Sequence, residues 1–179
     1  MGITGLKRHG KDTAAKLLVS EYGFTKISFA DKLKDVVSVA FAIPREWMDD
    51  DTMKESACPM YPDWTIRKLM QFVGTEMFRK TFPTIWLDLW MAEAMKHPRV
   101  VVPDVRFDNE LALVRSFGRH LTLRVFNPNL PENPDAHASE TGIMKLPVDM
   151  ELSNDGTIFN LHHKVKDAVE STRLLQYML

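Results

Sequence analysis

The residues best suited to chemistry lie near the start of the chain, in the stretch Gly5-Leu6-Lys7-Arg8-His9-Gly10-Lys11-Asp12-Thr13. Its two glycines, five residues apart, let the backbone curl so that successive N–H groups point at an anion. The lysine that follows can reach the outer phosphates of a nucleotide, and a helix beginning there directs its positive dipole end at the same phosphates. The spacing is that of a P-loop, except that Asp12 replaces the usual hydroxyl residue and Thr13 follows it.

The residues around this loop supply the context that a P-loop needs, which is a strand before it and a helix after it. Residues 12–22 carry alanine, leucine and tyrosine at helical spacing, and Gly23 is suited to end the helix. Residues 1–4 predict a short, weak strand. The alternative is a surface loop that is merely basic and glycine-containing, and it is disfavoured because the helix, its end and the lysine all agree.

Length and composition limit the classes of protein that can carry this loop. The 179 residues suffice for one domain with a core, and 45% hydrophobic and 26% charged residues are ordinary for a globular protein. The net charge of −1 gives no basic field for duplex nucleic acid. Cys58 is the only cysteine, and no apolar run reaches membrane-spanning length. We therefore expect a cytoplasmic protein with neither duplex nucleic acid nor a membrane as partner.

Strand and helix patterns alternate along the chain, which predicts a single α/β domain over residues 1–179, with a parallel sheet and helices on both faces. Asp31 is expected to cap the second helix and Asp63 a later one, because short acidic side chains accept hydrogen bonds from N–H groups at helix starts. Beyond the first helix, the expected strands are 24–30, 99–102, 120–125 and 150–153, and the expected helices are 31–43, 45–53, 64–82, 84–96, 110–117 and 157–179.

Two of these helices carry polar side chains that could meet a substrate. Lys34 lies near the start of the second helix, at the edge where parallel sheets bind ligands, and could take a phosphate. Arg67, Gly74 and Thr75 share one face of a later helix and could hold a phosphate or read a base. An exposed polar face is an equally good interpretation for these side chains. Of the two tryptophans on the next helix, one of which is Trp86, one is expected in the core and the other could stack on a base.

The segment after the 99–102 strand carries further candidates. Its β-branched run suits a buried central strand, and Asp104 follows it at the carboxyl end, where a Walker-B-type aspartate would meet the Mg²⁺ of a nucleotide. Arg106 could clamp a phosphate through two parallel hydrogen bonds. A structural ion pair is the alternative for both residues, and their place at the ligand edge of the sheet disfavours it. Glu110 opens the next helix.

Two loop regions and a turn complete the candidate set. Residues 44–64 include the acidic run 49–51, which is more typical of a solvated face than of a metal site. Residues 126–147 form a lid candidate, in which His137 is a weak candidate for catalysis. The turn Asn154-Asp155-Gly156 could hold an adenine against its backbone, and a plain turn explains it equally well.

Together these features suit phosphoryl transfer, which needs positioning and charge neutralisation more than covalent chemistry. Closure of lid-like segments would keep water away from the reacting phosphates. The cations that could surround the transferred group are Lys7, Arg8, Lys11, Arg67 and Arg106.

Several stretches resemble the deoxynucleoside monophosphate kinases of tailed bacteriophages. They are residues 5–13, Trp64-Thr-Ile-Arg-Lys-Leu-Met-Gln-Phe-Val-Gly-Thr75, Val102-Pro-Asp-Val-Arg106 and the late Asn154-Asp155-Gly156. The stretch from Trp64 to Thr75 is the most specific, and the similarity runs with gaps from Gly5 to the last helix. The resemblance implies a P-loop fold like that of nucleoside monophosphate kinases, ATP as donor, Mg²⁺, and a deoxynucleoside 5′-monophosphate (dNMP) as acceptor. A viral source would imply action in the host cytoplasm. Whether the protein forms a homodimer is left open by the sequence.

Carried over residue by residue, the resemblance implies a donor side, an acceptor side and a metal position. Lys11, Arg67, Asp104 and Arg106 would act on the transferred phosphoryl group, and Lys7 would lie between the two nucleotides. The acceptor segment would span about 31–96 and the lid about 126–147. ATP would be held by Arg8, Gly10, Lys11, Asp12, Thr13 and Asn154, the dNMP by Lys7, Lys34, Arg67, Gly74, Thr75, Trp86, Asp104, Arg106 and Glu110, and Mg²⁺ by Asp12, Thr13 and Asp104, directly or through water.

The chain departs from the family pattern in its lid candidate. Residues 126–147 contain no arginine, and their potential cations are Lys145 and His137. The segment between the second helix and Trp64 is also shorter than in some relatives. Two rival functions remain open: another small-molecule P-loop kinase, of the dephospho-coenzyme-A or phosphomevalonate type, and a nucleotide-binding regulatory protein without turnover.

Overall fold

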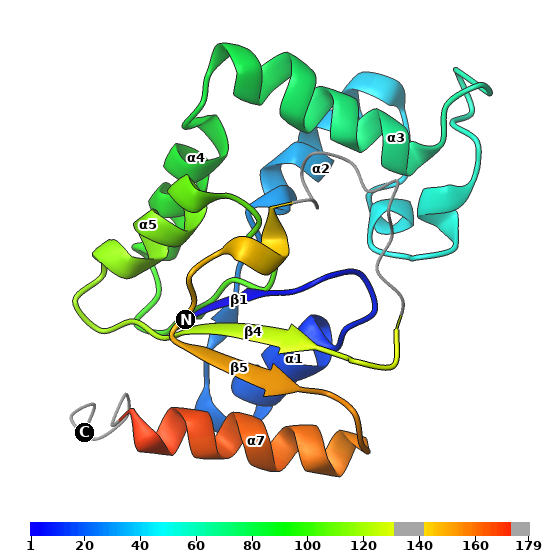
Figure 1. Ribbon diagram of the computed structural model, residues 1–179. Helices are drawn as coiled ribbons and strands as arrows, with labels where there is room; N and C mark the ends of the chain where they lie inside the picture. Colours follow the sequence, from blue (N-terminus) through cyan, green and yellow to red (C-terminus); the bar gives the residue numbers. More distant parts are fainter. Residues whose placement is uncertain (131–141, 173–179) are drawn as a thin grey trace. The chain divides into compact units, whose positions relative to one another are not determined.

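The computed structural model describes residues 1–130 and 142–172, which divide into two compact units (Figure 1). Unit 1 comprises Met1–Ser28 together with the described residues from Ala94 onward, and unit 2 comprises Phe29–Glu93. Unit 2 is thus inserted in the sequence of unit 1, and it coincides closely with the segment 31–96 expected to bind the acceptor. None of the described helices combines the length and the apolar character that crossing a membrane requires.

A parallel sheet of short strands forms the centre of unit 1. β2 pairs with β3, and β4 lies between β1 and β5, while a parallel bridge between Gly2 and Val102 joins the two sets. The order is therefore β2–β3–β1–β4–β5, with β1 in the middle. The described strands are β1 (Gly2–Thr4), β2 (Thr25–Lys26), β3 (Val100–Val101), β4 (Thr122–Phe126) and β5 (Met150–Ser153).

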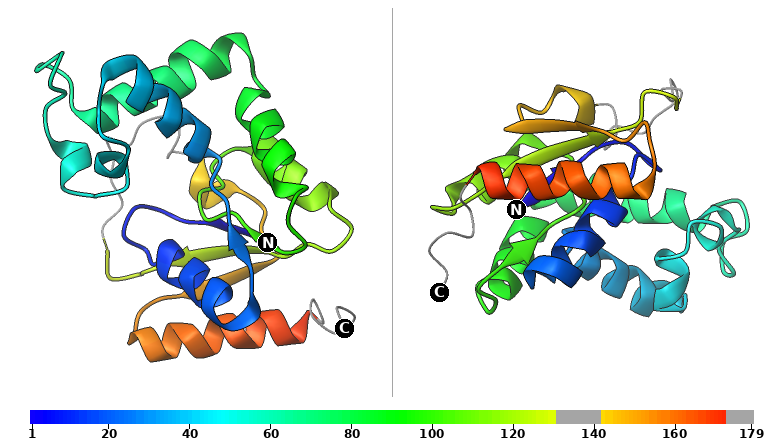
Figure 2. Two further views of the ribbon diagram at one scale, coloured as in Figure 1. Left: turned by 180° about the vertical axis from the view of Figure 1, so that it is seen from behind. Right: turned by 90° about the horizontal axis from the view of Figure 1, so that it is seen from below.

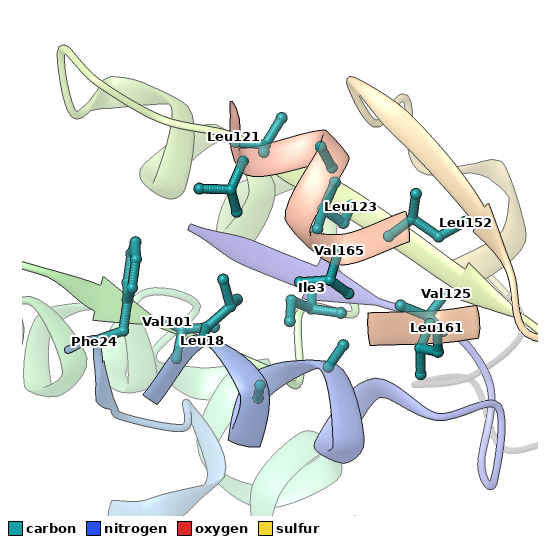
Figure 3. Packing of buried hydrophobic residues seen from close by; sticks show 14 residues of the cluster. Ile3, Leu18, Phe24, Val101, Leu121, Leu123, Val125, Leu152, Leu161 and Val165 are labelled. Atoms are coloured by element: carbon teal, nitrogen blue, oxygen red, sulfur yellow. The ribbon is translucent and has the colours of Figure 1, made fainter. Parts of the chain in front are cut away.

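Two helices lie side by side on one face of this sheet, α1 (Lys11–Tyr22) and α7 (Ile158–Ser171), as both views of Figure 2 show. Buried aliphatic side chains from both helices pack against Ile3 of β1, within the cluster drawn in Figure 3. Helix α1 ends at Gly23, whose φ of 66° is the left-handed cap that the sequence predicts.

The other face of the sheet is covered by α5 (Asp108–Ser116). Successive residues of a strand point to opposite faces, so Gly2 of β1 faces away from Ile3. A Cβ built on Gly2 would lie 3.1 Å from Cγ1 of Val114 in α5, which shows how closely this helix approaches the strand. The predicted fold class, α/β with a parallel sheet and helices on both faces, is thereby confirmed.

Unit 2 is helical and has its own small core. Its elements are α2 (Ala30–Phe41), the short 3₁₀ turns η1 (Arg45–Met48) and η2 (Met53–Glu55), α3 (Ile66–Gln71), the π-helix η3 (Phe72–Arg79) and α4 (Ile85–Ala94). The buried side chains at its centre are Val37, Ile43, Met48, Cys58, Ile66, Leu69 and Val73.

The structure corrects the cap predicted for the second helix. Helix α2 begins at Ala30, so Asp31 lies inside its first turn instead of before it. The Asp31 carboxylate accepts a hydrogen bond from Arg45 Nη2 at 3.2 Å. A capping side chain must precede the first helical turn, and Asp31 is one position too late for that role.

The helix expected over residues 64–82 also begins and winds differently. It starts at Ile66, where the hydroxyl of Thr65, in place of Asp63, accepts a hydrogen bond from the Lys68 N–H at 3.1 Å. From Phe72 the winding changes from α to π. Apolar spacing predicts that a helix is present, and it does not resolve 3.6 residues per turn from a wider turn over such a short stretch.

Candidate active site

Backbone conformation shapes the P-loop between β1 and α1. Gly5, Arg8 and Gly10 have positive φ values of 140°, 67° and 103°. A Cβ on Gly5 would lie 2.2 Å from the Val125 carbonyl oxygen, and one on Gly10 would lie 2.5 Å from Nδ2 of Asn154. Both glycines of the motif are therefore required by space as well as by conformation.

The two residues that begin α1 have charged partners or acceptors close at hand. Lys11 donates from Nζ to the carbonyl oxygen of Leu6 at 2.7 Å, so its ammonium group lies over the loop. The carboxylate of Asp12 is 3.1 Å from Nζ of Lys26 in β2, and the Asp12 side chain is 70% exposed. The position that usually carries a hydroxyl thus carries an accessible carboxylate next to a helix N-terminus.

Asn154 lies beside the P-loop. Its backbone N–H donates to the Phe126 carbonyl at 2.6 Å, and its side-chain amide donates to the His9 carbonyl at 3.1 Å. The sequence places Asn154 in a turn near the nucleotide, and the described contacts put its side chain against the loop that would hold the donor phosphates. An adenine contact of Asn154 stays a prediction.

His9 is a residue of this site that sequence reasoning did not single out. It exposes 5% of its surface, and its Nδ1 accepts a hydrogen bond from the Asn127 N–H at 3.1 Å. Burial, and after it the charge of Lys11, lowers the pKa of His9 below the ordinary histidine value. A histidine between two motif positions carries no pattern of its own, so no sequence signal could have identified it.

The segment that carries Asp104 and Arg106 runs beside β1 just before the P-loop. The N–H of Val105 donates to the Ile3 carbonyl at 3.2 Å, and the Thr4 hydroxyl donates to the Val105 carbonyl at 2.7 Å. Because Thr4 directly precedes Gly5, these bonds bring the two predicted strand-end residues to the same edge of the sheet as the loop. This juxtaposition is what a Walker-B-type position needs.

Glu110 supports this segment from the first turn of α5. Only 2% of its surface is exposed, and its Oε2 accepts from the N–H groups of Arg106 and Phe107 at 2.7 and 3.2 Å. It therefore satisfies N–H groups at a helix start. Its predicted contact with the acceptor or the metal stays a prediction.

In unit 2, Lys34 is engaged by the acidic run. Its Nζ lies 2.7 Å from Asp49 Oδ1, and Arg45 Nη1 donates to the other oxygen of Asp49 at 2.6 Å. Partial burial raises the pKa of the Asp49 carboxyl, and the hydrogen bonds and charges of Lys34 and Arg45 outweigh that effect and lower it. The carboxylate therefore stays ionised between two cations.

Arg67 is held in a similar way. Its Nε donates to Glu55 Oε1 at 2.7 Å, and its Nη2 lies 3.7 Å from Asp51 Oδ1. Nη2 is itself buried and has no hydrogen-bond partner. Asp50, between the two paired aspartates, accepts from the N–H groups of Thr52 and Met53. Within residues 1–130 and 142–172, no group of three or more His, Cys, Asp and Glu could hold a metal ion.

Gly74 and Trp86 lie inside unit 2. The indole N–H of Trp86 donates to the Gly74 carbonyl at 2.9 Å, and a Cβ on Gly74 would lie 2.7 Å from Leu33 Cδ2. Trp86 and Trp90 are 4% and 5% exposed, so the expectation of a core tryptophan holds for both. Trp86 therefore supports the π-helical turn at Gly74, and neither its predicted contact with the dNMP nor that of Thr75 is tested by these contacts.

The lid candidate 126–147 is described only in part. His137 lies outside the described residues. Lys145, in the short turn Ile143–Lys145, is exposed. The carbonyl of Leu146 accepts a hydrogen bond from Arg124, a buried arginine of β4 that also pairs with Glu151.

The chain is similar to several known proteins over most of its length. A family model described as deoxynucleotide monophosphate kinase matches residues 45–165. The putative deoxynucleotide monophosphate kinase of Acanthamoeba polyphaga mimivirus is 30% identical over 187 residues, covering 96% of each chain. The deoxynucleotide monophosphate kinase of Enterobacteria phage T4 is 23% identical, covering 94% of this chain and 97% of that protein. The crystal structure of TT1252 from Thermus thermophilus shares the fold, with a TM-score of 0.53 at 19% identity and 95% of each chain covered.

Proposed function

The chain belongs to the deoxynucleotide monophosphate kinase family, and we propose that it transfers the γ-phosphoryl group of ATP to a dNMP, giving ADP and the deoxynucleoside diphosphate. The observation that carries this proposal is the P-loop, whose glycines cannot bear a Cβ and whose Lys11 lies over the loop. A loop of this kind at a helix N-terminus is an anion site.

Unit 1 supplies the donor side of this proposal. The loop N–H groups and the start of α1 would receive the ATP phosphates, and Lys11 would exchange the Leu6 carbonyl for a phosphate oxygen. Arg8, exposed at a positive φ of 67°, adds a cation to the same loop. Because Gly10 has no Cβ, the Asn154 side chain can pack against the loop at this point and hold the backbone whose N–H groups would face the phosphates.

Asp12, Thr13 and Asp104 are the residues that would hold a magnesium ion bound together with ATP, and the exposed Asp12 carboxylate at the start of α1 supports this assignment. Mg²⁺ at kinase sites is usually held by one or two carboxylates, water and the substrate phosphates, so a dense acidic cluster is not needed. The ion would neutralise charge on the transferred group. Lys26 would then hold the Asp12 carboxylate near the phosphates when the metal is absent.

Unit 2 supplies cations for the acceptor side. Lys34 and Arg67 are the candidates. Gly74 and Thr75 of η3, which continues the helix of Arg67, belong to the same proposed set, and so does Trp86, whose indole N–H donates to the Gly74 carbonyl. Each of the two cations already has a carboxylate partner, and a phosphate dianion would take over that position as a stronger, multidentate acceptor. In unit 1, the residues that the family resemblance assigns to the acceptor are Lys7, Asp104, Arg106 and Glu110.

The transfer needs no general base from the protein, because an oxygen of the acceptor monophosphate is already ionised at neutral pH. That oxygen forms a bond to the γ-phosphorus while the bond from the γ-phosphorus to the β–γ bridging oxygen breaks, and ADP leaves with the electron pair. Lys11, Arg67 and Arg106 would stabilise negative charge on the phosphoryl group during its transfer, and Asp104 would orient the metal or its waters.

A coupled assay of ADP release tests this proposal and separates it from its rivals. We expect turnover with at least one of dAMP, dCMP, dGMP and dTMP, and none with dephospho-coenzyme A or phosphomevalonate. Lys11→Ala should lower kcat/KM by about three orders of magnitude while the melting temperature stays within about 3 °C. Turnover with a non-nucleotide acceptor alone would favour another small-molecule kinase, and ATP binding without any turnover would favour a regulatory protein.

A further inference from the structure

Two strand ends converge on one residue of the P-loop. Asn127 is the first residue after β4, and Asn154 is the first residue after β5. The Asn127 N–H donates to His9 Nδ1, the Asn154 side chain donates to the His9 carbonyl, and the Asn154 N–H donates to Phe126. These bonds close a ring of contacts in which His9 is the only member that belongs to the loop.

The direction of the bond from Asn127 fixes the state of the imidazole. Nδ1 can accept a hydrogen only when it carries no proton, so the ring is neutral with its proton on Nε2. Protonation would place an N–H at Nδ1 opposite the N–H of Asn127, and two donors repel each other. Burial of the ring and the nearby charge of Lys11 both favour the neutral form.

Among the described residues, the hydrogen-bond partners of His9 from the other elements carry no charge that would hold a protonated ring. The residues that follow β4 and β5 and donate hydrogen bonds to His9 are the uncharged Asn127 and Asn154. The next residue, Asp155, is paired with Lys164 of α7 at 3.0 Å. The charged group that acts on His9 is therefore the P-loop lysine, and it acts against protonation.

We propose that His9 is a positioning residue for the donor nucleotide, which holds the P-loop in its phosphate-binding shape by accepting the hydrogen bond of Asn127. The inference rests on the proposed function in one respect, that this loop binds ATP. If the acceptor is lost, the part-buried N–H of Asn127 has no hydrogen-bond partner, and the loop is no longer attached to the end of β4. ATP binding must then also order the loop, which lowers the affinity. Protonation of His9 has the same effect as removal of the acceptor.

Two variants of equal shape separate the acceptor from the side chain's bulk. In His9→Asn, Oδ1 is bonded to Cγ as Nδ1 is in histidine, so the acceptor stays and cannot titrate. His9→Leu has the same branching without an acceptor. His163→Asn, which changes an exposed histidine of α7, is the matched control. Circular dichroism and thermal melting establish that each variant is folded.

The measurement is the Kd of ATP by isothermal titration calorimetry from about pH 5 to about pH 8, across the histidine range. His9→Leu is expected to bind roughly tenfold more weakly than wild type at neutral pH. Wild type and His163→Asn should lose affinity below the ordinary histidine pKa, and His9→Asn should lose less. Protonation of ATP itself affects all proteins alike, so the difference between the curves is the readout.

Two results would overturn the inference while leaving the proposed function standing. One is a His9→Leu variant that binds ATP as tightly as wild type, and the other is an acid loss in His9→Asn as steep as in wild type. Should His9→Leu fail to fold, the pH curve of His9→Asn still decides. No ATP binding by wild type at any pH would instead overturn the proposed function, and the role of His9 with it.

Discussion

The P-loop of unit 1 and the paired cations of unit 2 are held in place by different forces. The loop depends on backbone conformation and on neutral hydrogen bonds around a buried histidine. Lys34 and Arg67 depend on ion pairs whose carboxylates, Asp49 and Glu55, are 58% and 49% exposed. Exposed ion pairs contribute little and are screened by salt, whereas the loop's contacts are insensitive to salt.

This difference suggests two ways of preparing a phosphate site. A preformed loop is already ordered when the protein has folded, so ligand binding costs no further conformational entropy and breaks no existing contact. A paired cation must leave its carboxylate, so its affinity for phosphate is lowered by the strength of the pair it breaks. We expect the donor side to respond to backbone changes and the acceptor side to respond to charge and salt.

The largest effect is expected from Gly10→Ala, which distorts the preformed loop. An alanine at φ 103° is strained, and its Cβ would meet the Asn154 side chain at 2.5 Å. ATP affinity should fall by at least about 30-fold, measured by calorimetry. Gly118→Ala is the matched control, because a Cβ there meets nothing within 4 Å. Equal ATP affinity in the two variants would mean that the loop is not preformed.

A smaller effect is expected from Arg67→Ala in unit 2. It removes a cation of the proposed acceptor side, so the KM for the dNMP should rise by about tenfold or more while the KM for ATP changes by less than about twofold. Steady-state kinetics with each substrate varied checks this. Lys54→Ala, which removes another partner of Asp51 in the same unit, should change neither value. Equal rises in both KM values would show that Arg67 does not act on the acceptor alone.

The smallest effect is expected from Asp49→Asn, which removes the carboxylate shared by Lys34 and Arg45. The KM for the dNMP should fall about two- to threefold at low salt, and the gain should vanish at high salt. If the KM is unchanged at low salt, Lys34 does not bind the acceptor phosphate.

The same variant has a defined pH dependence of stability. The ion pairs hold the folded pKa of Asp49 below its ordinary value of 3.8. Their contribution is therefore present above that value and is lost as pH falls through the lower folded pKa. Since Asp49 is more than half exposed, the contribution is under about 1 kcal/mol. The melting temperatures of wild type and variant should converge in acid.

Patterns with a strong period or a steric rule could be predicted from the sequence. The helix after the P-loop, its Gly23 cap and strand β5 at Met150–Ser153 were all located to within a residue. The run 99–102 was predicted to be a buried central strand. The structure has a strand there, β3, over Val100–Val101, and it lies between β2 and β1, one place from the middle of the sheet. Each of these predictions depends on residues that are close together in the sequence, and such local preferences are kept in the folded structure.

Features created by distant residues could not be predicted. β1 gives a weak signal because it consists of Gly2, Ile3 and Thr4, yet it is the middle strand, and its glycine is explained only by the approach of α5. The carboxylate partners of Lys34 and Arg67 are Asp49 and Glu55, which lie in a region of short turns. The path of such turns cannot be predicted from the spacing of apolar residues. His9 gains its hydrogen bonds from Asn127 and Asn154, which follow two strands far along the chain.

The distances in sequence between these contacts set the order in which the molecule can mature. Unit 2 is one continuous stretch, so its contacts form between near neighbours and are available early in synthesis. The bonds that hold the P-loop join residues 118 and 145 positions apart. The P-loop is therefore synthesised well before the residues that hold it, and it can reach its described shape only after β5 and the turn after it have emerged.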